Sequence, residues 1–86
     1  MLNQIVLVGR LYESSTNEKL VIAVPRAFKN KEGIYETDFI ECQALGGIAE
    51  KTKEYCKKGD LVGIRGRITT GNTIIVEKIS FLKSGE

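Results

Sequence analysis

Two arginines, Arg65 and Arg67, stand two positions apart in a segment that otherwise contains mostly apolar residues and glycine. Successive side chains of a β-strand point to opposite faces. In a strand, both arginines would therefore face outward together, while Val62, Ile64 and Ile68 fill a core. The segment predicts fixed positive charge on the outside of a sheet, which is suited to contact with a polyanion.

Strands dominate the first half of the chain. Residues 5–8 are apolar on both faces, which predicts a strand covered by the core on one side and by a partner subunit on the other. A polar connection at 13–18 leads to a second strand at 20–24, and Pro25 marks an edge or the end of regular pairing. Residues 29–33 form a charged turn.

The second half predicts one helix among strands. Residues 37–45 alternate, with Ile40, Cys42 and Ala44 facing inward and Phe39 facing outward. A helix is predicted by residues that recur at helical spacing: Ile48, Ala49, Thr52, Tyr55 and Cys56. Gly59 is expected to end this helix. Strands at 61–69 and 73–82 are joined by a short turn at 70–72.

Composition sets limits on domain number, redox state and location. The chain has 86 residues, 42% of them hydrophobic and 28% charged, so residues 1–86 are expected to form a single globular domain. The net charge of +2 does not by itself indicate nucleic-acid binding. Cys42 and Cys56 are expected to be buried free thiols in a reducing compartment. No segment reaches membrane-spanning length and no secretory signal is present, so a cytoplasmic, nucleoid-associated protein without membrane contact is expected.

The order of elements predicts an all-β fold with one helix. Three strands, a helix and two more strands are the order of the OB-fold, a five-stranded Greek-key barrel with its helix between strands three and four. Periodicity alone leaves other small barrels open. The chain also resembles the bacterial single-stranded DNA-binding protein family, at residues 3–11, 23–30, 38–42, 57–68 and 77–82. These blocks occur in the family's order and span nearly the whole chain.

The resemblance implies a barrel that binds single strands on a basic surface and pairs through its first strand. Binding without sequence preference requires cations along the phosphate path and flat rings on which bases stack. Phe28, Phe39 and Tyr35 are the candidate rings. Tyr55 and Phe81 are assigned to the core, and Tyr12 is not assigned.

The candidate cations are Arg10, Arg26, Lys29, Lys31, Arg65 and Arg67. Ion pairs with Glu41 or Glu77 are the alternative use of the last two, and exposed pairs of that kind contribute little. The remaining lysines of the helical segment are interpreted as a solvated face.

The implied assembly is a homodimer, with a homotetramer also open. Ile5, Val6, Leu7 and Val8 are the expected dimer interface, because an exposed strand of that kind otherwise invites aggregation. Replication or recombination proteins are further candidate partners.

Four departures distinguish this chain from the family, and three of them suggest a shortened member. Leu45 stands where the family usually carries a large aromatic residue, and tryptophan is absent. The turn at 70–72 replaces the family's long arm, and the connection at 14–18 is short. The sequence ends at Glu86 without the family's acidic tail. These features predict weaker binding over fewer nucleotides.

Other functions remain to be weighed against ssDNA binding. An OB-fold module for protein interaction and an RNA-binding OB domain are both compatible with the residues, since stacking does not read the sugar. Catalysis is not expected, because the sequence has no histidine and no phosphate-binding loop. No metal site and no cofactor are predicted, because two distant cysteines do not make a zinc site.

Overall fold

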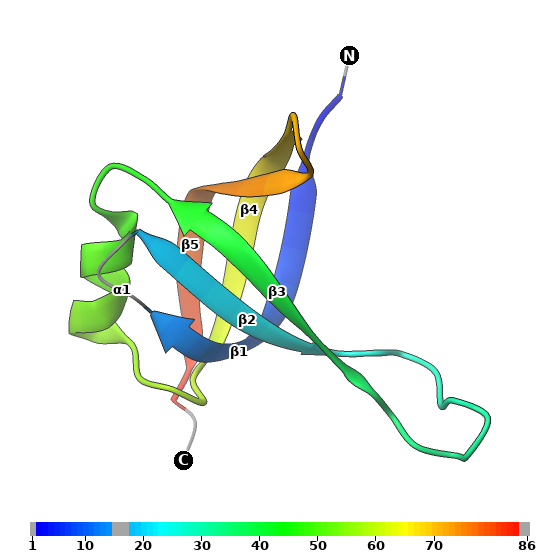
Figure 1. The fold of residues 1–86 in the computed structure, drawn as a ribbon. Coiled ribbons are helices and arrows are strands. Elements are labelled where there is room, and N and C mark those ends of the chain that lie inside the picture. Colours follow the sequence, from blue (N-terminus) through cyan, green and yellow to red (C-terminus); the bar gives the residue numbers. More distant parts are fainter. Residues whose placement is uncertain (1, 15–17, 85–86) are drawn as a thin grey trace.

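A closed barrel of five strands forms the body of the molecule in a computed structural model that describes residues 2–14 and 18–84. The strands are β1 (Ile5–Ser14), β2 (Lys19–Pro25), β3 (Thr37–Ala44), β4 (Leu61–Thr69) and β5 (Thr73–Lys83), and α1 (Ile48–Tyr55) lies between β3 and β4. Neighbouring strands follow the order β1-β2-β3-β5-β4 around the barrel. The predicted OB-fold with its helix between strands three and four is confirmed (Figure 1).

Strand β1 closes the barrel by pairing with a different neighbour in each half. Residues from Ile5 to Arg10 pair with β4, and residues from Arg10 to Ser14 pair with β2. β1 is therefore longer than predicted, since Glu13 and Ser14 continue the ladder. Residues 15–17 of the predicted first connection lie outside the described residues.

The core comes from the inward faces of the strands and from one side of the helix. Leu20, Ile22 and Val62 are fully buried, and the alternation predicted for β3 is confirmed by Cys42 and Ala44. Cys42 and Cys56 are free and buried, and burial raises the pKa of both thiols to about 11.

Ile68 was expected in the core but is 41% exposed. The last β4 residue that pairs with β1 is Gly66, so Ile68 lies past the end of that pairing, where β5 is the only strand paired with β4. Asn3 covers the outer backbone there, because its side chain accepts a hydrogen bond from the Ile68 N–H and donates one to the Ile68 carbonyl. The predicted turn at 70–72 is confirmed, with Thr69 and Thr73 paired across it.

The helix is shorter than its spacing suggested. It ends at Tyr55, and Cys56 is already extended. Gly59 therefore does not end the helix. It lies in the following turn with a φ of 96°, and its N–H donates to the Leu11 carbonyl.

Tyr55 and Phe81 were assigned to the core, but they are 62% and 40% exposed. Ala49 and Thr52 provide the buried side of the helix instead. Tyr55 is the last residue of α1 and Phe81 lies near the end of β5, so each ring stands at the end of its element and faces the other ring instead of the core.

Candidate nucleic-acid interface

Exposed rings and cations gather on the outer face of β1, β2 and β3, which we call the ring face. Arg10, Ala23 and Phe39 are register partners across the three strands, with Arg10 and Phe39 both exposed. The ring of Phe39 is 57% exposed, as its alternation with Ile40 predicted. Arg10 donates to the Gly59 carbonyl at 2.9 Å, which holds its side chain against the surface.

Tyr12 is a member of the ring face that the sequence interpretation left unassigned. Its ring centroid lies 4.8 Å from that of Phe39, with the planes tilted by 60°. The Lys58 ammonium stands 4.5 Å from the centroid of the Tyr12 ring. The sequence held a signal for Tyr12 in the alternation of β1. Gly9 and Leu11 face inward and Arg10 faces outward, so the next residue, Tyr12, faces outward as well.

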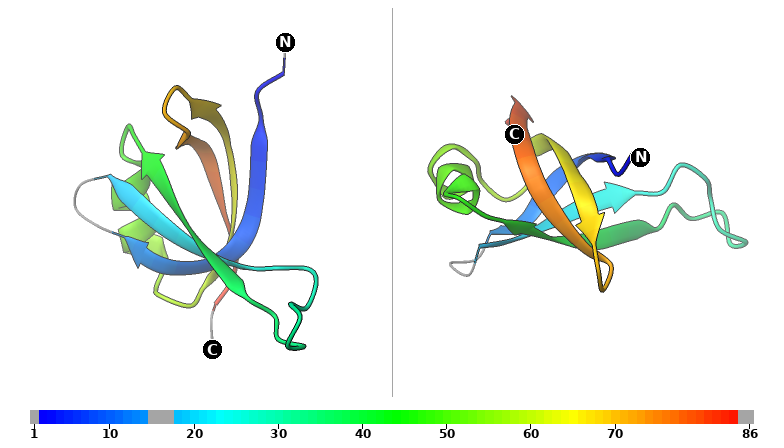
Figure 2. Two further views of the ribbon diagram at one scale, coloured as in Figure 1. Left: turned by 45° about the vertical axis from the view of Figure 1, so that its right-hand side comes forward. Right: turned by 90° about the horizontal axis from the view of Figure 1, so that it is seen from above.

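The loop between β2 and β3 carries the other two predicted rings. It projects away from the barrel at the end opposite α1 (Figure 2). Phe28 is 84% exposed and Tyr35 is 56% exposed. The Lys29 ammonium lies 5.6 Å from the centroid of the Tyr35 ring, and Lys31 is exposed on the same loop. A base and its phosphate could both be contacted there.

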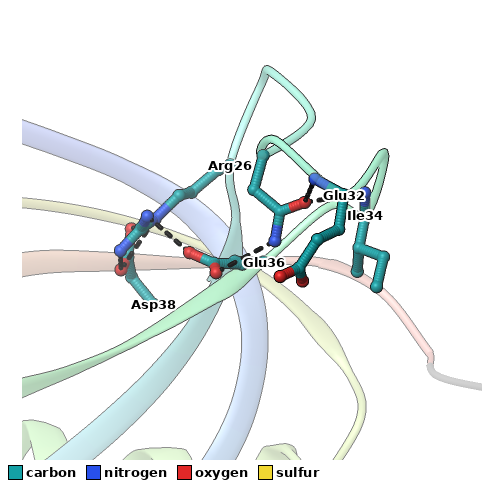
Figure 3. Close-up of polar contacts among 6 residues, drawn as sticks. Arg26, Glu32, Ile34, Glu36 and Asp38 are labelled. Atoms are coloured by element: carbon teal, nitrogen blue, oxygen red, sulfur yellow. Dashed lines mark hydrogen bonds and ion pairs between the residues drawn. The ribbon is translucent and has the colours of Figure 1, made fainter.

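The base of this loop is held by Arg26. Its guanidinium bonds both oxygens of Asp38, the shortest of these contacts being 2.9 Å, and it contacts Glu36 at 2.7 Å (Figure 3). The hydrogen bonds from Arg26 lower the pKa of the Asp38 carboxyl, and the same pair raises the pKa of Arg26. Two carboxylates therefore compensate this arginine, which was one of the candidate cations for phosphate contact.

Asn30 completes the loop by organising its tip. Its side-chain oxygen accepts from the backbone N–H groups of Glu32 and Ile34, while its amide donates to Glu36 at 3.1 Å. Gly33, with a φ of 79°, supplies the left-handed residue that the predicted turn requires. Arg26 and Asn30 share Glu36, so one cluster of side chains fixes the segment that carries Phe28.

Arg65 and Arg67 lie on another side of the barrel. Arg65 is opposite Val6 on β1 and Lys78 on β5, so it lies on the outer face formed by β1, β4 and β5. Arg67 contacts Glu77 at 3.6 Å, which is one of the two ion pairs weighed above. Both arginines face outward together as predicted, but the structure does not bring them together with Phe28 and Phe39.

The predicted dimer strand shows two different faces. Val6 and Val8 are 67% and 52% exposed, next to Arg65. Leu7 is partly buried against the core, and Ile5 alternates with the exposed valines. The outer half of the predicted interface is thus an apolar patch on the β1–β4–β5 face.

Two further features limit the chemistry within the described residues. At positions 2–14 and 18–84, no group of three or more histidine, cysteine, aspartate or glutamate residues could hold a metal ion. The only helix in those ranges is far too short to cross a membrane.

Comparison with solved structures supports the fold. A mitochondrial single-stranded DNA binding protein from S. cerevisiae superposes with a TM-score of 0.72 at 20% identity, covering 99% of this chain and 100% of that one. A small single-stranded DNA-binding protein from Streptomyces coelicolor gives a TM-score of 0.62 at 18% identity, covering 95% of each chain.

Sequence relatives carry the family assignment. Single-stranded DNA-binding protein B of Bacillus subtilis is 43% identical over 79 residues, which cover 81% of this chain and 70% of that protein. Single-stranded DNA-binding protein 3 of Listeria innocua is 34% identical over 98% of this chain, which spans 66% of the relative. Residues 2–78 match the model of the single-strand binding protein family. The chain therefore belongs to the single-strand binding protein family.

Proposed function

We propose that this chain binds single-stranded DNA without sequence preference, through base stacking on the ring face and phosphate contacts around it. The observation that carries the proposal is the contact between the exposed rings of Tyr12 and Phe39 on a face that also presents Arg10 and Lys58. Flat rings beside cations suit a polyanion with exposed bases, and every base has a ring face. Family membership and the relatives' names support the same activity.

The path of the strand follows from the placement of these groups. Bases of the DNA stack on Phe28 and Tyr35 at the projecting loop. Further bases stack on Phe39 and Tyr12, so the DNA crosses β3 and β1 toward α1. Lys29, Lys31 and Arg10 are the phosphate ligands along this path, while Arg26 positions the loop. Arg65 and Arg67 are not on this path, because they lie on the β1–β4–β5 face.

A homodimer through the β1–β4–β5 face is the second part of the proposal. Val6 and Val8 present an exposed apolar surface next to Arg65, and an outward surface of this kind is typical of association sites. A twofold axis near β1 would cover both valines with the same residues of a second copy. Replication or recombination proteins on the nucleoid are the further partners in this proposal.

Fluorescence anisotropy with labelled oligo-dT and matched oligo-U, at several salt concentrations, tests the binding. If about four phosphates are neutralised, the slope of log affinity against log salt is about −3, at about 0.7 per contact. Preference for oligo-U would assign the chain to RNA. Failure to bind either would favour a protein-interaction module, and tight binding without salt dependence would contradict phosphate contacts.

A further inference from the structure

Two exposed rings lie outside the ring face, at the edge between α1 and β5. Tyr55 and Phe81 have their centroids 6.2 Å apart with planes tilted by 45°. They line a depression of about 540 Å³ between the end of the helix and the end of the barrel's last strand, which we call the helix–β5 cleft. Such rings on a soluble protein offer flat apolar surface to a ligand.

The charge around the helix–β5 cleft is predominantly positive. The cleft is lined by two carboxylates, those of Glu54 and Asp60, and by four lysines: Lys53, Lys57, Lys58 and Lys83. The Asp60 carboxylate already accepts a hydrogen bond from the Lys57 backbone N–H at 2.8 Å. The cleft therefore combines stacking surface with an excess of cations, which is the chemistry of an anionic ligand with flat groups.

The helix–β5 cleft is continuous with the ring face. A second depression, of about 230 Å³, begins at Tyr12 and shares Lys53, Cys56 and Lys58 with the cleft. Lys58 stands over the Tyr12 ring at 4.5 Å, and Tyr12 in turn contacts Phe39. Rings and lysines thus follow one another from the ring face to Phe81.

We infer that single-stranded nucleic acid bound on the ring face continues past Tyr12 and Lys58 into the helix–β5 cleft. There Tyr55 and Phe81 stack further bases, and the lysines bind the phosphates between them. This inference rests on the proposed function and extends its site by a segment. An acidic peptide would also complement the positive charge of the cleft. The residues that the cleft shares with the depression at Tyr12 favour the nucleic acid that is already bound on the ring face.

The length dependence of binding tests the inference with the full chain. Anisotropy is measured for oligo-dT from about 4 to about 16 nucleotides, the range of site sizes known for OB-folds. The test variant is Lys57→Ala combined with Lys83→Ala, because both lysines line the cleft and neither lines the depression at Tyr12. The control is Lys78→Ala, which removes a cation from β5 at a position that lines none of the depressions around Tyr12, Tyr55 and Phe81.

The test variant should match the unaltered chain on short oligonucleotides and lose affinity on long ones. Loss of two phosphate contacts makes the salt slope on long oligonucleotides shallower by about 1.4. Phe81→Ala should show the same length dependence, and Lys78→Ala should show none. Melting temperatures of all variants establish that they are folded.

The possible outcomes separate the two claims. If the unaltered chain binds no oligo-dT of any length, the proposed function is overturned. If it binds, but both cleft variants match it at every length, only the extension into the cleft is overturned. Saturable binding of a labelled glutamate-rich peptide, lost in the test variant while oligo-dT binding is unchanged, would assign the cleft to a peptide and overturn the extension as well.

Discussion

Arg26, just after the end of β2, donates two hydrogen bonds to one carboxylate oxygen of Asp38 on β3. The two guanidinium nitrogens lie 2.9 and 3.2 Å from that oxygen. The same arginine contacts Glu36, which Asn30 also bonds. An exposed ion pair of this kind contributes little to global stability. Its effect is local, because it closes the base of the loop that carries Phe28.

Loosening this cluster should weaken binding more than it lowers stability. Asp38→Asn removes the charge that pairs with Arg26, so we expect a several-fold loss of oligo-dT affinity with little change in melting temperature. Glu32→Gln is the matched control, since it lies in the same loop and only its backbone N–H takes part in the cluster. Equal effects of the two substitutions would argue against the positioning role of Arg26.

The loop should also loosen in acid. Because Arg26 lowers the pKa of Asp38 below its ordinary value of 3.8, the ion pair is complete above that value. It is lost as the pH falls through the lowered pKa, where the carboxylate binds a proton. Amide resonances of residues 26–38, followed by NMR during acidification, should shift together with the Asp38 carboxyl. Loop resonances that move only well above pH 4 would point to a different group.

Removing the ring of either Tyr12 or Phe39 should reduce the affinity for oligonucleotides of all base compositions to a similar extent. Stacking contributes about 1 to 3 kcal/mol per base, so Phe39→Ala or Tyr12→Ala should weaken oligonucleotide binding about 5- to 150-fold. Because the two rings touch, the double variant should lose less than the sum of the single losses. Titrations with oligo-dT, oligo-dC and oligo-dA measure this. Selective loss for one base would indicate recognition of base edges instead.

Charge on the outward valines of β1 should prevent dimer formation. Val6→Glu combined with Val8→Glu places two carboxylates in the proposed interface, where burial without a partner is costly. Sedimentation at micromolar concentration should show a dimer for the unaltered chain and a monomer for this variant. Ile34→Glu, on the exposed loop, is the control. A monomeric unaltered chain at that concentration refutes the dimer.

Two glycines of β4 should respond differently to a methyl group. A Cβ at Gly66 would collide with the Ile75 carbonyl, where β4 and β5 shift register. A Cβ at Gly63 would meet only Leu82 Cδ1 at 3.5 Å, an ordinary contact. Gly66→Ala should therefore destabilise the fold by about 1 to 3 kcal/mol. Gly63→Ala should lower the free energy of unfolding by less. Urea unfolding measures both changes, and the opposite order would contradict this account of the β4–β5 contact.

Much of the barrel could be predicted because strand alternation is a local property. The inward set of β3 and the outward positions of Phe39, Arg65 and Arg67 follow from a period of two residues. The turn at 70–72 follows from its glycine and its polar neighbours. Lengths were less predictable, as in β1 and α1, because pairing partners and packing decide where an element ends.

The sequence by itself determined the family, the order of elements and which side chains point outward, since these depend on neighbours along the chain. Only the tertiary structure decided which outward side chains meet. It joined Tyr12 with Phe39 and Lys58, paired Arg26 with Asp38, and separated Arg65 from the rings. The reason is physical: barrel closure fixes strand order and register, and register alone determines which residues of distant segments become neighbours.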